Sequence, residues 1–171
     1  QDLMEELSTL CADLPKVKAV VAGGSSRQES VENGLSALSK EVKLAAIQDG
    51  ARPLVTWQLI DRVVRAANSY HAAVPVIPVK DTIKVCNTGL VISTPDRDSL
   101  RAVQTPQAFD FDLLRGALKY AFENGKEITD DCSAVELLGM SVKTVDGDER
   151  NLKVTTPIDL KFAEMLMEEN T

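Results

Sequence analysis

Hydrophobic and polar residues alternate with two different periods along this chain. In some segments apolar residues recur every three or four positions, as on one face of a helix, and in others they form short runs, as in a buried strand. The predicted helices cover residues 2–14, 30–38, 56–67, 111–124, 129–138 and 156–169, and the predicted strands cover 17–21, 42–47, 72–79 and 142–145. This alternation indicates βαβ units and predicts an α/β fold with a mostly parallel sheet, whose ligands bind beyond the carboxyl ends of the strands.

One segment interrupts this alternation. Two short β-like runs, 81–86 and 90–94, flank turn residues at 87–89, which predicts a β-hairpin inserted into the α/β unit. A lone two-stranded hairpin is marginally stable in water and has unpaired edges, so we expect this arm, residues 81–100, to pack on another subunit. We find no internal repeat or linker and predict a single domain over residues 1–171, incomplete at its N-terminal end.

Composition narrows the class of protein. The chain has 171 residues, of which 44% are hydrophobic and 4% aromatic, a bias that suits helices packed on a sheet in one domain. The formal net charge is −7 and no run is rich in lysine or arginine, which argues against a nucleic-acid partner. Any anionic ligand must therefore be held by a few local basic residues and backbone N–H groups.

The cysteines and the apolar runs indicate a cellular compartment. Cys11, Cys86 and Cys132 are widely spaced and lack a C-x-x-C pattern, which favours a reducing compartment and argues against disulfides or a zinc site. No apolar stretch reaches the length of a membrane span and no leader is visible, so we expect a soluble, cytoplasmic protein without a membrane partner. His71 is the only histidine, and we assign it no catalytic role.

Two turns that follow predicted strands carry groups suited to phosphates. Residues 23–30 form a turn rich in Gly and Ser before a helix, where backbone N–H groups can meet a ligand, although a tight turn with a serine cap explains the same residues. Asp49 follows the next strand, where its carboxylate can hold a Mg²⁺-bound phosphate at the edge of the sheet. The alternative is a turn aspartate paired with Arg52.

The base of the hairpin carries a second candidate group. If its strands pair, Thr82 and Lys84 approach Thr94 and Arg97, and two hydroxyls with two cations suit a phosphomonoester. A solvated ribbon whose charges discourage aggregation is the alternative interpretation.

Three more residues are candidates for the binding site because of the segments in which they lie. Thr105 and Thr129 add hydroxyl groups, although the segment around Thr129 is also a good helix N-cap. Lys153 lies in a β-like run directly before a predicted helix, where a single lysine is usually a surface charge.

Taken together, these stretches resemble one family. The matching segments are AGGSSRQESVENGL from Ala22, DGARP from Asp49, PVKDTIK from Pro78, STPDRDSLRAVQTPQAF from Ser93, ITDDCSAVE from Ile128 and GDERNLKVTTPIDL from Gly147. In order and spacing they are similar to the 2-C-methyl-D-erythritol 4-phosphate cytidylyltransferases, which have a Rossmann-like nucleotidyltransferase fold. Ribitol 5-phosphate cytidylyltransferases are related, but the DTIK, TPDR and TDD segments look more like the methylerythritol branch.

The resemblance implies a role for each candidate residue. Gly24 and Ser30 would hold the cytidine, Asp49 would orient the nucleotide phosphates or their Mg²⁺, and Lys153 would stabilise charge on the reacting α-phosphate. The implied substrate-binding residues also include Arg52, Thr105 and Thr129, while Thr82 and the catalytic Arg97 would reach the site from the partner subunit of a homodimer through the arm.

The reaction implied by the resemblance joins CTP to methylerythritol phosphate in isoprenoid precursor biosynthesis. A phosphate oxygen of the sugar phosphate would attack the α-phosphorus of CTP in line, and pyrophosphate would leave. No side-chain nucleophile is needed, so catalysis would consist of positioning and of charge stabilisation by Mg²⁺ and lysine.

Two departures from the family pattern affect these expectations. Gln48 stands where the family usually has His, a change from which we expect a small effect. Nothing before Gln1 supplies the glycine-rich loop with which family members grip the triphosphate, so we expect the chain alone to be inactive or nearly so. The alternatives are a ribitol 5-phosphate enzyme and a dimerising, non-catalytic fragment.

Overall fold

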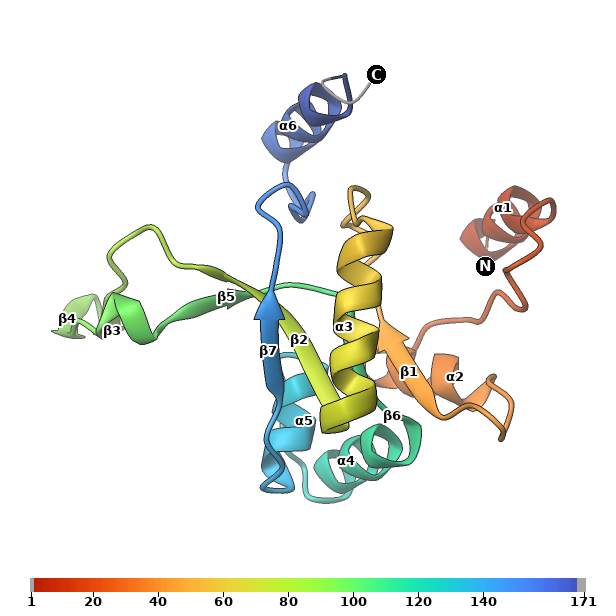
Figure 1. Cartoon of the computed structure of the whole chain (residues 1–171), viewed down its shortest axis with the longest axis horizontal. Helices are drawn as coiled ribbons and strands as arrows, with labels where there is room; N and C mark the ends of the chain where they lie inside the picture. The colour runs from red at the N-terminus through yellow and green to blue at the C-terminus, as the bar shows by residue number, and fades with distance from the viewer. Residues whose placement is uncertain (1, 169–171) are drawn as a thin grey trace.

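The computed structural model describes residues 2–168. Its helices are α1 (Asp2–Cys11), α2 (Arg27–Ser36), α3 (Trp57–Tyr70), α4 (Phe111–Glu123), α5 (Asp131–Leu137) and α6 (Pro157–Glu168), with a 3-10 turn at Arg97–Ser99. Its strands are β1 (Leu44–Ile47), β2 (Ala72–Pro78), β3 (Val85–Asn87), β4 (Leu90–Ser93), β5 (Arg101–Val103), β6 (Gln107–Asp110) and β7 (Lys143–Asp146) (Figure 1). The predicted α/β class is confirmed. Glu169, the last residue of the predicted closing helix, lies outside the described residues.

The main sheet is built around β2. Ala73 of β2 pairs with Lys143 of β7 in parallel on one edge and with Ala108 of β6 in antiparallel on the other. Further along the second edge, β2 pairs with β5 in antiparallel. β1 extends the sheet beyond β6, with Ile47 opposite Gln107. This register places the end of β1 beside the start of β6.

The prediction of a mostly parallel sheet is wrong for the described residues. Of the pairings in the main sheet, only β2 with β7 is parallel, whereas β1 with β6, β2 with β6 and β2 with β5 are antiparallel. The difference comes from residues 101–110, which run back along β2 after the arm as two strands that the sequence pattern missed. Strands of three and four residues contain too few positions for a periodic signal.

Residues 17–21, predicted as a buried strand, form no strand. Val17 and Val21 are 39% and 41% exposed, and the segment is part of the irregular link between α1 and α2 (Figure 1). A strand needs a neighbour for its N–H and C=O groups, and among residues 2–168 this segment has no strand partner.

Two apolar clusters hold helices on opposite faces of the sheet. Alternate residues of β2 point to opposite faces, so Ala72 and Val74 join one cluster and Ala73 joins the other. The first cluster contains Phe109, Leu114, Leu118 and Val135 and binds α2, α4 and α5, and the second contains Leu59, Val63 and Ala67 of α3. Burial of each large side chain stabilises the fold by about 1.5–3 kcal/mol.

Side-chain oxygens cap the helices that carry site residues. Ser26 accepts a hydrogen bond from the Glu29 N–H at the start of α2, and Asp130 accepts one from the Ser133 N–H at the start of α5. Helix α2 therefore begins three residues before the predicted start, and its cap is Ser26 instead of a residue near Ser30. Residues 27–29 are polar, and the first turn of the helix therefore adds nothing to the apolar pattern from which its start was predicted.

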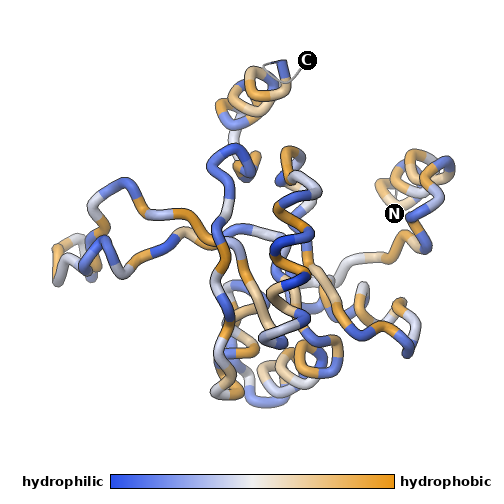
Figure 2. The backbone as a smooth tube through the Cα atoms, in the orientation of Figure 1, coloured by the Kyte–Doolittle hydropathy of each residue, from blue (hydrophilic) through white to orange (hydrophobic). Residues whose placement is uncertain are grey.

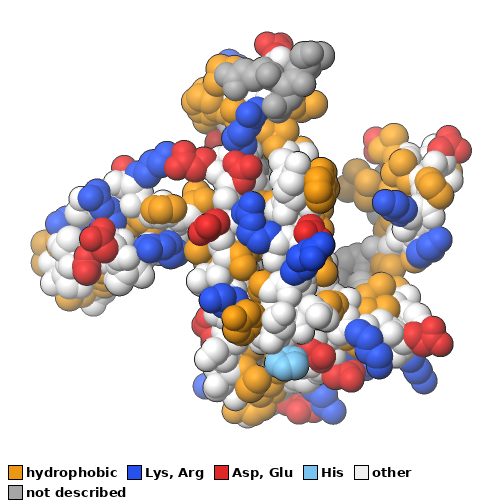
Figure 3. All heavy atoms as spheres, in the orientation of Figure 1, with side chains coloured by type: hydrophobic (Ala, Val, Ile, Leu, Met, Phe, Trp, Pro, Cys, Tyr) orange, Lys and Arg blue, Asp and Glu red, His pale blue; other side chains and the backbone are white. Residues whose placement is uncertain are grey.

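The hairpin of β3 and β4 extends away from the main sheet (Figure 1). Its apolar residues Leu90, Val91 and Ile92 are 72%, 60% and 62% exposed. Figure 2 shows hydrophobic and hydrophilic residues mixed along the arm, and Figure 3 shows basic and acidic side chains interspersed over this face of the molecule. Among the described helices, each is too short or too polar to span a bilayer.

Candidate functional site

The ends of three segments meet beside Asp49. Asp49 follows β1, and Thr105 precedes β6, the antiparallel neighbour of β1. The loop after β7 is attached to the same place because the Val154 N–H donates to the Ala51 carbonyl at 2.7 Å, which brings Lys153 to the site. Lys153 thus lies in an irregular loop, and the prediction of a β-like run at this position is wrong.

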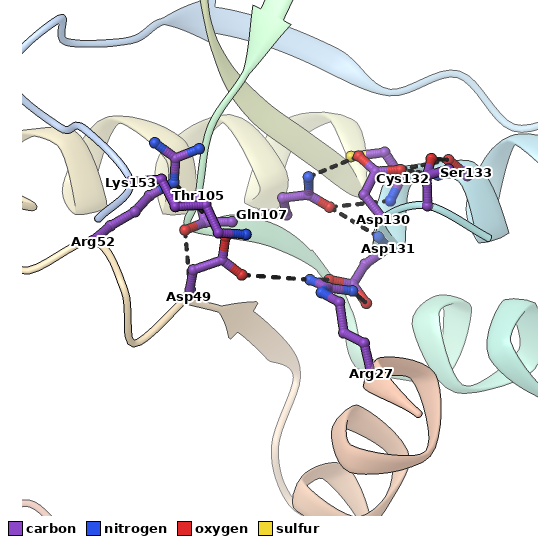
Figure 4. Close-up of polar contacts among 11 residues, drawn as sticks. Arg27, Asp49, Arg52, Thr105, Gln107, Asp130, Asp131, Cys132, Ser133 and Lys153 are labelled. Atoms are coloured by element: carbon purple, nitrogen blue, oxygen red, sulfur yellow. Dashed lines mark hydrogen bonds and ion pairs between the residues drawn. The ribbon is translucent and has the colours of Figure 1, made fainter. Parts of the chain in front are cut away.

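Three cations surround the carboxylate of Asp49 (Figure 4). The Lys153 Nζ lies 2.9 Å from Asp49 Oδ2, and the Arg52 Nε lies 3.8 Å from the same oxygen. The Arg27 Nη2 lies 4.0 Å from Asp49 Oδ1. The Asp49 side chain is only 17% exposed, so water screens these charges less than it would on an open surface.

Hydrogen bonds fix the backbone around this carboxylate. The hydroxyl of Thr105, a buried residue, accepts from the Asp49 N–H at 3.0 Å. The Asn151 side chain donates to the Thr105 carbonyl at 2.8 Å, and the Arg52 guanidinium donates to the Asn151 carbonyl at 2.6 Å. Burial lowers the pKa of Arg52, and the charge of Asp49 partly offsets this effect. The Arg52 Nε has no hydrogen-bond acceptor, so its pairing with Asp49 is a long ionic contact.

A second carboxylate, Asp131, anchors Arg27. The Arg27 guanidinium donates two hydrogen bonds to Asp131, at 3.0 and 2.7 Å, and the Asp131 side chain is fully buried. Hydrogen bonding to Asp131 raises the pKa of Arg27, and burial partly opposes this rise. The pair joins the first residues of α2 and α5.

The buried amide of Gln107 organises the start of α5. Its oxygen accepts from the N–H groups of Asp131 and Cys132, both at 3.1 Å, and its nitrogen donates to the Asp130 carboxylate at 2.8 Å. The Thr129 and Ser133 hydroxyls lie 3.2 Å apart beside this cluster. Burial also raises the pKa of the Cys132 thiol, which favours an inert, protonated thiol.

Two cavities adjoin the site. One, of about 660 Å³, is lined by polar groups that include Asp49, Arg52, Thr105, Thr129 and Lys153. The other, of about 680 Å³, is lined by Ser30, apolar residues of α2 and the β1 strand. Arg27 and Asp49 line both, so they form part of the wall between the cavities.

The predicted site residues fall into three groups. Asp49, Arg52, Thr105, Thr129 and Lys153 line one cavity together. Gly24 lies apart from this group, and its N–H donates to the Ser30 hydroxyl at 2.9 Å, so the glycine turn and the second cavity are connected.

Thr82 and Arg97 lie on the exposed arm. They do not line either cavity of their own chain, and Arg97 donates to the Lys80 carbonyl at 3.0 Å. Lys84 and Thr94, also predicted at the base of the hairpin, are paired at 2.7 Å.

Sequence reasoning did not assign roles to Arg27, Gln107, Asp131 or Asn151. Arg27 gave no signal, because the apolar pattern begins the helix at residue 30 and only the structure places this cation at the first position of α2, where the helix dipole calls for a compensating anion. Gln107 and Asn151 gave none either, since each acts through contacts with segments far away in the sequence.

The set of donors limits the metals that could bind. Among residues 2–168, no group of three or more His, Cys, Asp or Glu side chains is placed to hold a metal ion. Asp49 is a single carboxylate, which matches the way Mg²⁺ is bound by one or two carboxylates together with substrate phosphates.

Comparison with known proteins identifies similar sequences. The family model described as 2-C-methyl-D-erythritol 4-phosphate cytidylyltransferase matches residues 1–169. A protein of that name from Caldanaerobacter subterraneus subsp. tengcongensis is 48% identical over 149 residues, which are 86% of this chain and 66% of the relative. One from Desulforamulus reducens is 45% identical over 167 residues, 93% of this chain and 71% of the relative. The chain thus spans about two thirds of the length of these relatives.

Solved structures of similar proteins share the fold. A 2-C-methyl-D-erythritol 4-phosphate cytidylyltransferase from Thermus thermophilus has a TM-score of 0.78 and 39% identity, covering 89% of this chain and 77% of that one. A 4-diphosphocytidyl-2C-methyl-D-erythritol synthase from Anaerococcus prevotii has a TM-score of 0.91 and 29% identity, covering 98% and 78%.

Proposed function

The chain belongs to the 2-C-methyl-D-erythritol 4-phosphate cytidylyltransferase family, and from this membership we propose that it binds CTP and methylerythritol phosphate for cytidylyl transfer. The observation that carries the proposal is the contact of Lys153 with Asp49 at 2.9 Å in the wall of a cavity that also contains Thr105 and Thr129. Cations, a carboxylate and hydroxyls in one cavity suit two phosphate-bearing substrates.

In the proposed reaction this chain supplies position and charge. Lys153 and Arg52 stabilise negative charge that develops on the α-phosphate, and water screens the largely buried Arg52 less than the half-exposed Lys153. Thr129 and Thr105 face the sugar phosphate, and Ser30 and Gly24 hold the cytidine from the second cavity. Pyrophosphate leaves as the sugar phosphate oxygen bonds to the α-phosphorus.

Magnesium is the proposed metal, and Asp49 is the residue that would hold it. Because Asp49 already lies close to three cations, a free divalent ion would be repelled there, so the metal binds together with the triphosphate. When bound, Mg²⁺ neutralises charge on the phosphate oxygens.

The arm is proposed to complete the site of a second copy. Arg97 and Thr82 are exposed on the arm and do not line the cavities of their own chain, which supports a role in the partner's site. The apolar residues at 90–92 give the arm a surface for that contact.

The test measures binding and turnover in the same samples. Thermal unfolding of the chain is followed with Mg²⁺ and CTP, and separately with methylerythritol phosphate or with ribitol 5-phosphate. Pyrophosphate release is measured as well. We expect CTP and methylerythritol phosphate each to raise the unfolding temperature by about 5 °C at saturating concentration, because they bind only the folded state. Lys153→Met is expected to abolish the CTP shift, and the exposed Lys161→Met serves as its control.

Each outcome distinguishes one function from another. A shift with methylerythritol phosphate but not with ribitol 5-phosphate supports the proposal, and the reverse result identifies a ribitol 5-phosphate enzyme. If the chain dimerises but no nucleotide or sugar phosphate stabilises it, the proposal is wrong and the chain is a dimerisation fragment.

A further inference from the structure

The contact between Arg27 and Asp131 has no role in the function proposed above. It joins residues 104 positions apart in the chain, at 3.0 and 2.7 Å. Arginine binds a carboxylate in this paired way because its planar fork matches the two oxygens, so the contact fixes the plane of the guanidinium as well as its charge.

Arg27 occupies a position that is unfavourable for a cation on its own. It is the first residue of α2, where the positive end of the helix dipole repels it. It nevertheless lines both cavities, and its Nη2 lies 4.0 Å from Asp49 Oδ1, whereas Lys153 contacts the other oxygen, Oδ2 (Figure 4). Arg27 and Lys153 therefore restrain Asp49 through different oxygens.

Asp131 is held rigidly enough to act as an anchor. Its side chain is fully buried at the first residue of α5, and its N–H donates to the Gln107 amide oxygen. Gln107 belongs to β6 in the main sheet and is itself buried. The backbone that carries the Asp131 carboxylate is thus held by the sheet and by α5.

We propose that Asp131 is a positioning residue for nucleotide binding, and that it acts by fixing the Arg27 guanidinium in the wall between the two cavities. Arg27 then restrains Asp49 and presents its remaining N–H donors to the nucleotide phosphates. The contact with Asp131 uses two of the five donors of a guanidinium, which leaves the others for an anionic ligand. This inference rests on the proposed function, because it assumes that CTP binds here.

The test is a double-mutant cycle on the binding of CTP with Mg²⁺, measured by isothermal titration calorimetry well below the unfolding temperature. Asp131→Asn and Arg27→Met are each expected to weaken binding about ten-fold. The double variant is expected to bind no more weakly than Arg27→Met, since Asp131 acts only through Arg27. Arg65→Met, which removes an exposed arginine paired with Asp61 on α3, is the control and is expected to bind like the wild type.

A second variant covers the case in which Asp131→Asn does not fold. Arg27→Lys keeps the charge on a half-exposed side chain but loses the paired geometry, and it is expected to weaken binding about five-fold. In ¹⁵N NMR, the Arg27 Nε–H resonance, assigned by its absence in Arg27→Lys, is expected to shift when CTP is added to the wild type. An ion pair that only stabilises the fold would leave this resonance unchanged.

The outcomes separate the two proposals. If the wild type does not bind CTP, the proposed function fails and this inference fails with it. If the wild type binds CTP and Asp131→Asn or Arg27→Lys binds equally well, only this inference is overturned. Independent effects of the two substitutions, whose fold-changes multiply in the double variant, would also overturn it.

Discussion

Asp130 shows how a single carboxylate can serve both a helix and a site. Burial opposes its ionisation, but hydrogen bonds from the hydroxyl and N–H of Ser133 and from the Gln107 amide outweigh burial and hold its pKa below the ordinary value. One of these bonds, from the Ser133 N–H, caps α5, the helix that carries Asp131.

A pH dependence of stability follows from this lowered pKa. Because the ionised form is favoured in the folded state, its stabilisation is present above the ordinary pKa of about 3.9 and is lost as the pH falls through the lower, folded value. We expect Asp130→Asn to cost about 1 kcal/mol in the free energy of unfolding at pH 7, since a charged acceptor is replaced by a neutral one. Urea unfolding of both proteins at pH 7, 4 and 3 measures this difference.

The difference between wild type and Asp130→Asn should shrink below pH 4. Ser133→Ala, which removes one of the donors, is expected to give a smaller version of the same change. A constant difference between pH 7 and pH 3 would show that the loss comes from the cap geometry and not from the charge.

Some residue contacts could be predicted from the sequence and others could not. Asp49, Thr105 and Lys153 were expected together because the family resemblance joins their motifs, and the structure places them in one cavity wall. The Gln107 contacts depend on how β6 lies against the start of α5. Neither the short strand nor this packing leaves a periodic pattern in the sequence.

At the scale of elements, α3 ends in a conformation that favours glycine. His71 has a φ of 67° and an exposed side chain, while its N–H donates to the Ala67 carbonyl and β2 begins at the next residue. A left-handed residue with a Cβ is strained by about 1–2 kcal/mol, and glycine removes this strain. Part of that gain is lost because glycine makes the unfolded chain more flexible.

We therefore expect His71→Gly to raise the free energy of unfolding by about 0.5–1 kcal/mol. His71→Val should lower it by more than 1 kcal/mol, because a β-branched residue tolerates this conformation least. Equilibrium urea unfolding measures both, with His71→Asn expected close to the wild type. A glycine variant less stable than the wild type would mean that the imidazole contributes packing that outweighs the strain.

The elements differ in how well they could be predicted. Helix α3 and strand β2 have long, clear apolar patterns that packing confirms, with Leu59, Val63 and Ala73 in one cluster. Strands β5 and β6 have no such pattern, and they determine that most of the pairings are antiparallel. The segment 17–21 is apolar enough for a strand but has no strand partner in the described chain, which sequence pattern alone cannot reveal.

At the scale of the whole molecule, the arm carries large apolar side chains that are exposed to solvent. Leu90 and Ile92 are 72% and 62% exposed on a hairpin that extends from the main sheet. If the arm packs on a second copy, Ile92→Lys should weaken the dimer about 30-fold, the effect of losing a contact worth about 2 kcal/mol. Sedimentation equilibrium over a range of concentrations measures the dissociation constant.

A matched control separates the arm from general surface effects. Phe122→Lys, which changes a residue of α4 that is 74% exposed, should leave the dissociation constant unchanged. A protein that is monomeric at all concentrations, or a dimer weakened by Phe122→Lys but not by Ile92→Lys, would rule out the arm as the contact.

The hydrogen bond from Val154 to Ala51, which brings Lys153 to the site, joins segments that are translated far apart in time. Asp49 is translated about a hundred residues before Lys153, so in a nascent chain only Arg27 and Arg52, of the three cations around its carboxylate, have been made. Chains that stall or are clipped before residue 151 would keep the sheet residues but lack this lysine. Ligand affinity is therefore expected to report whether synthesis passed Lys153.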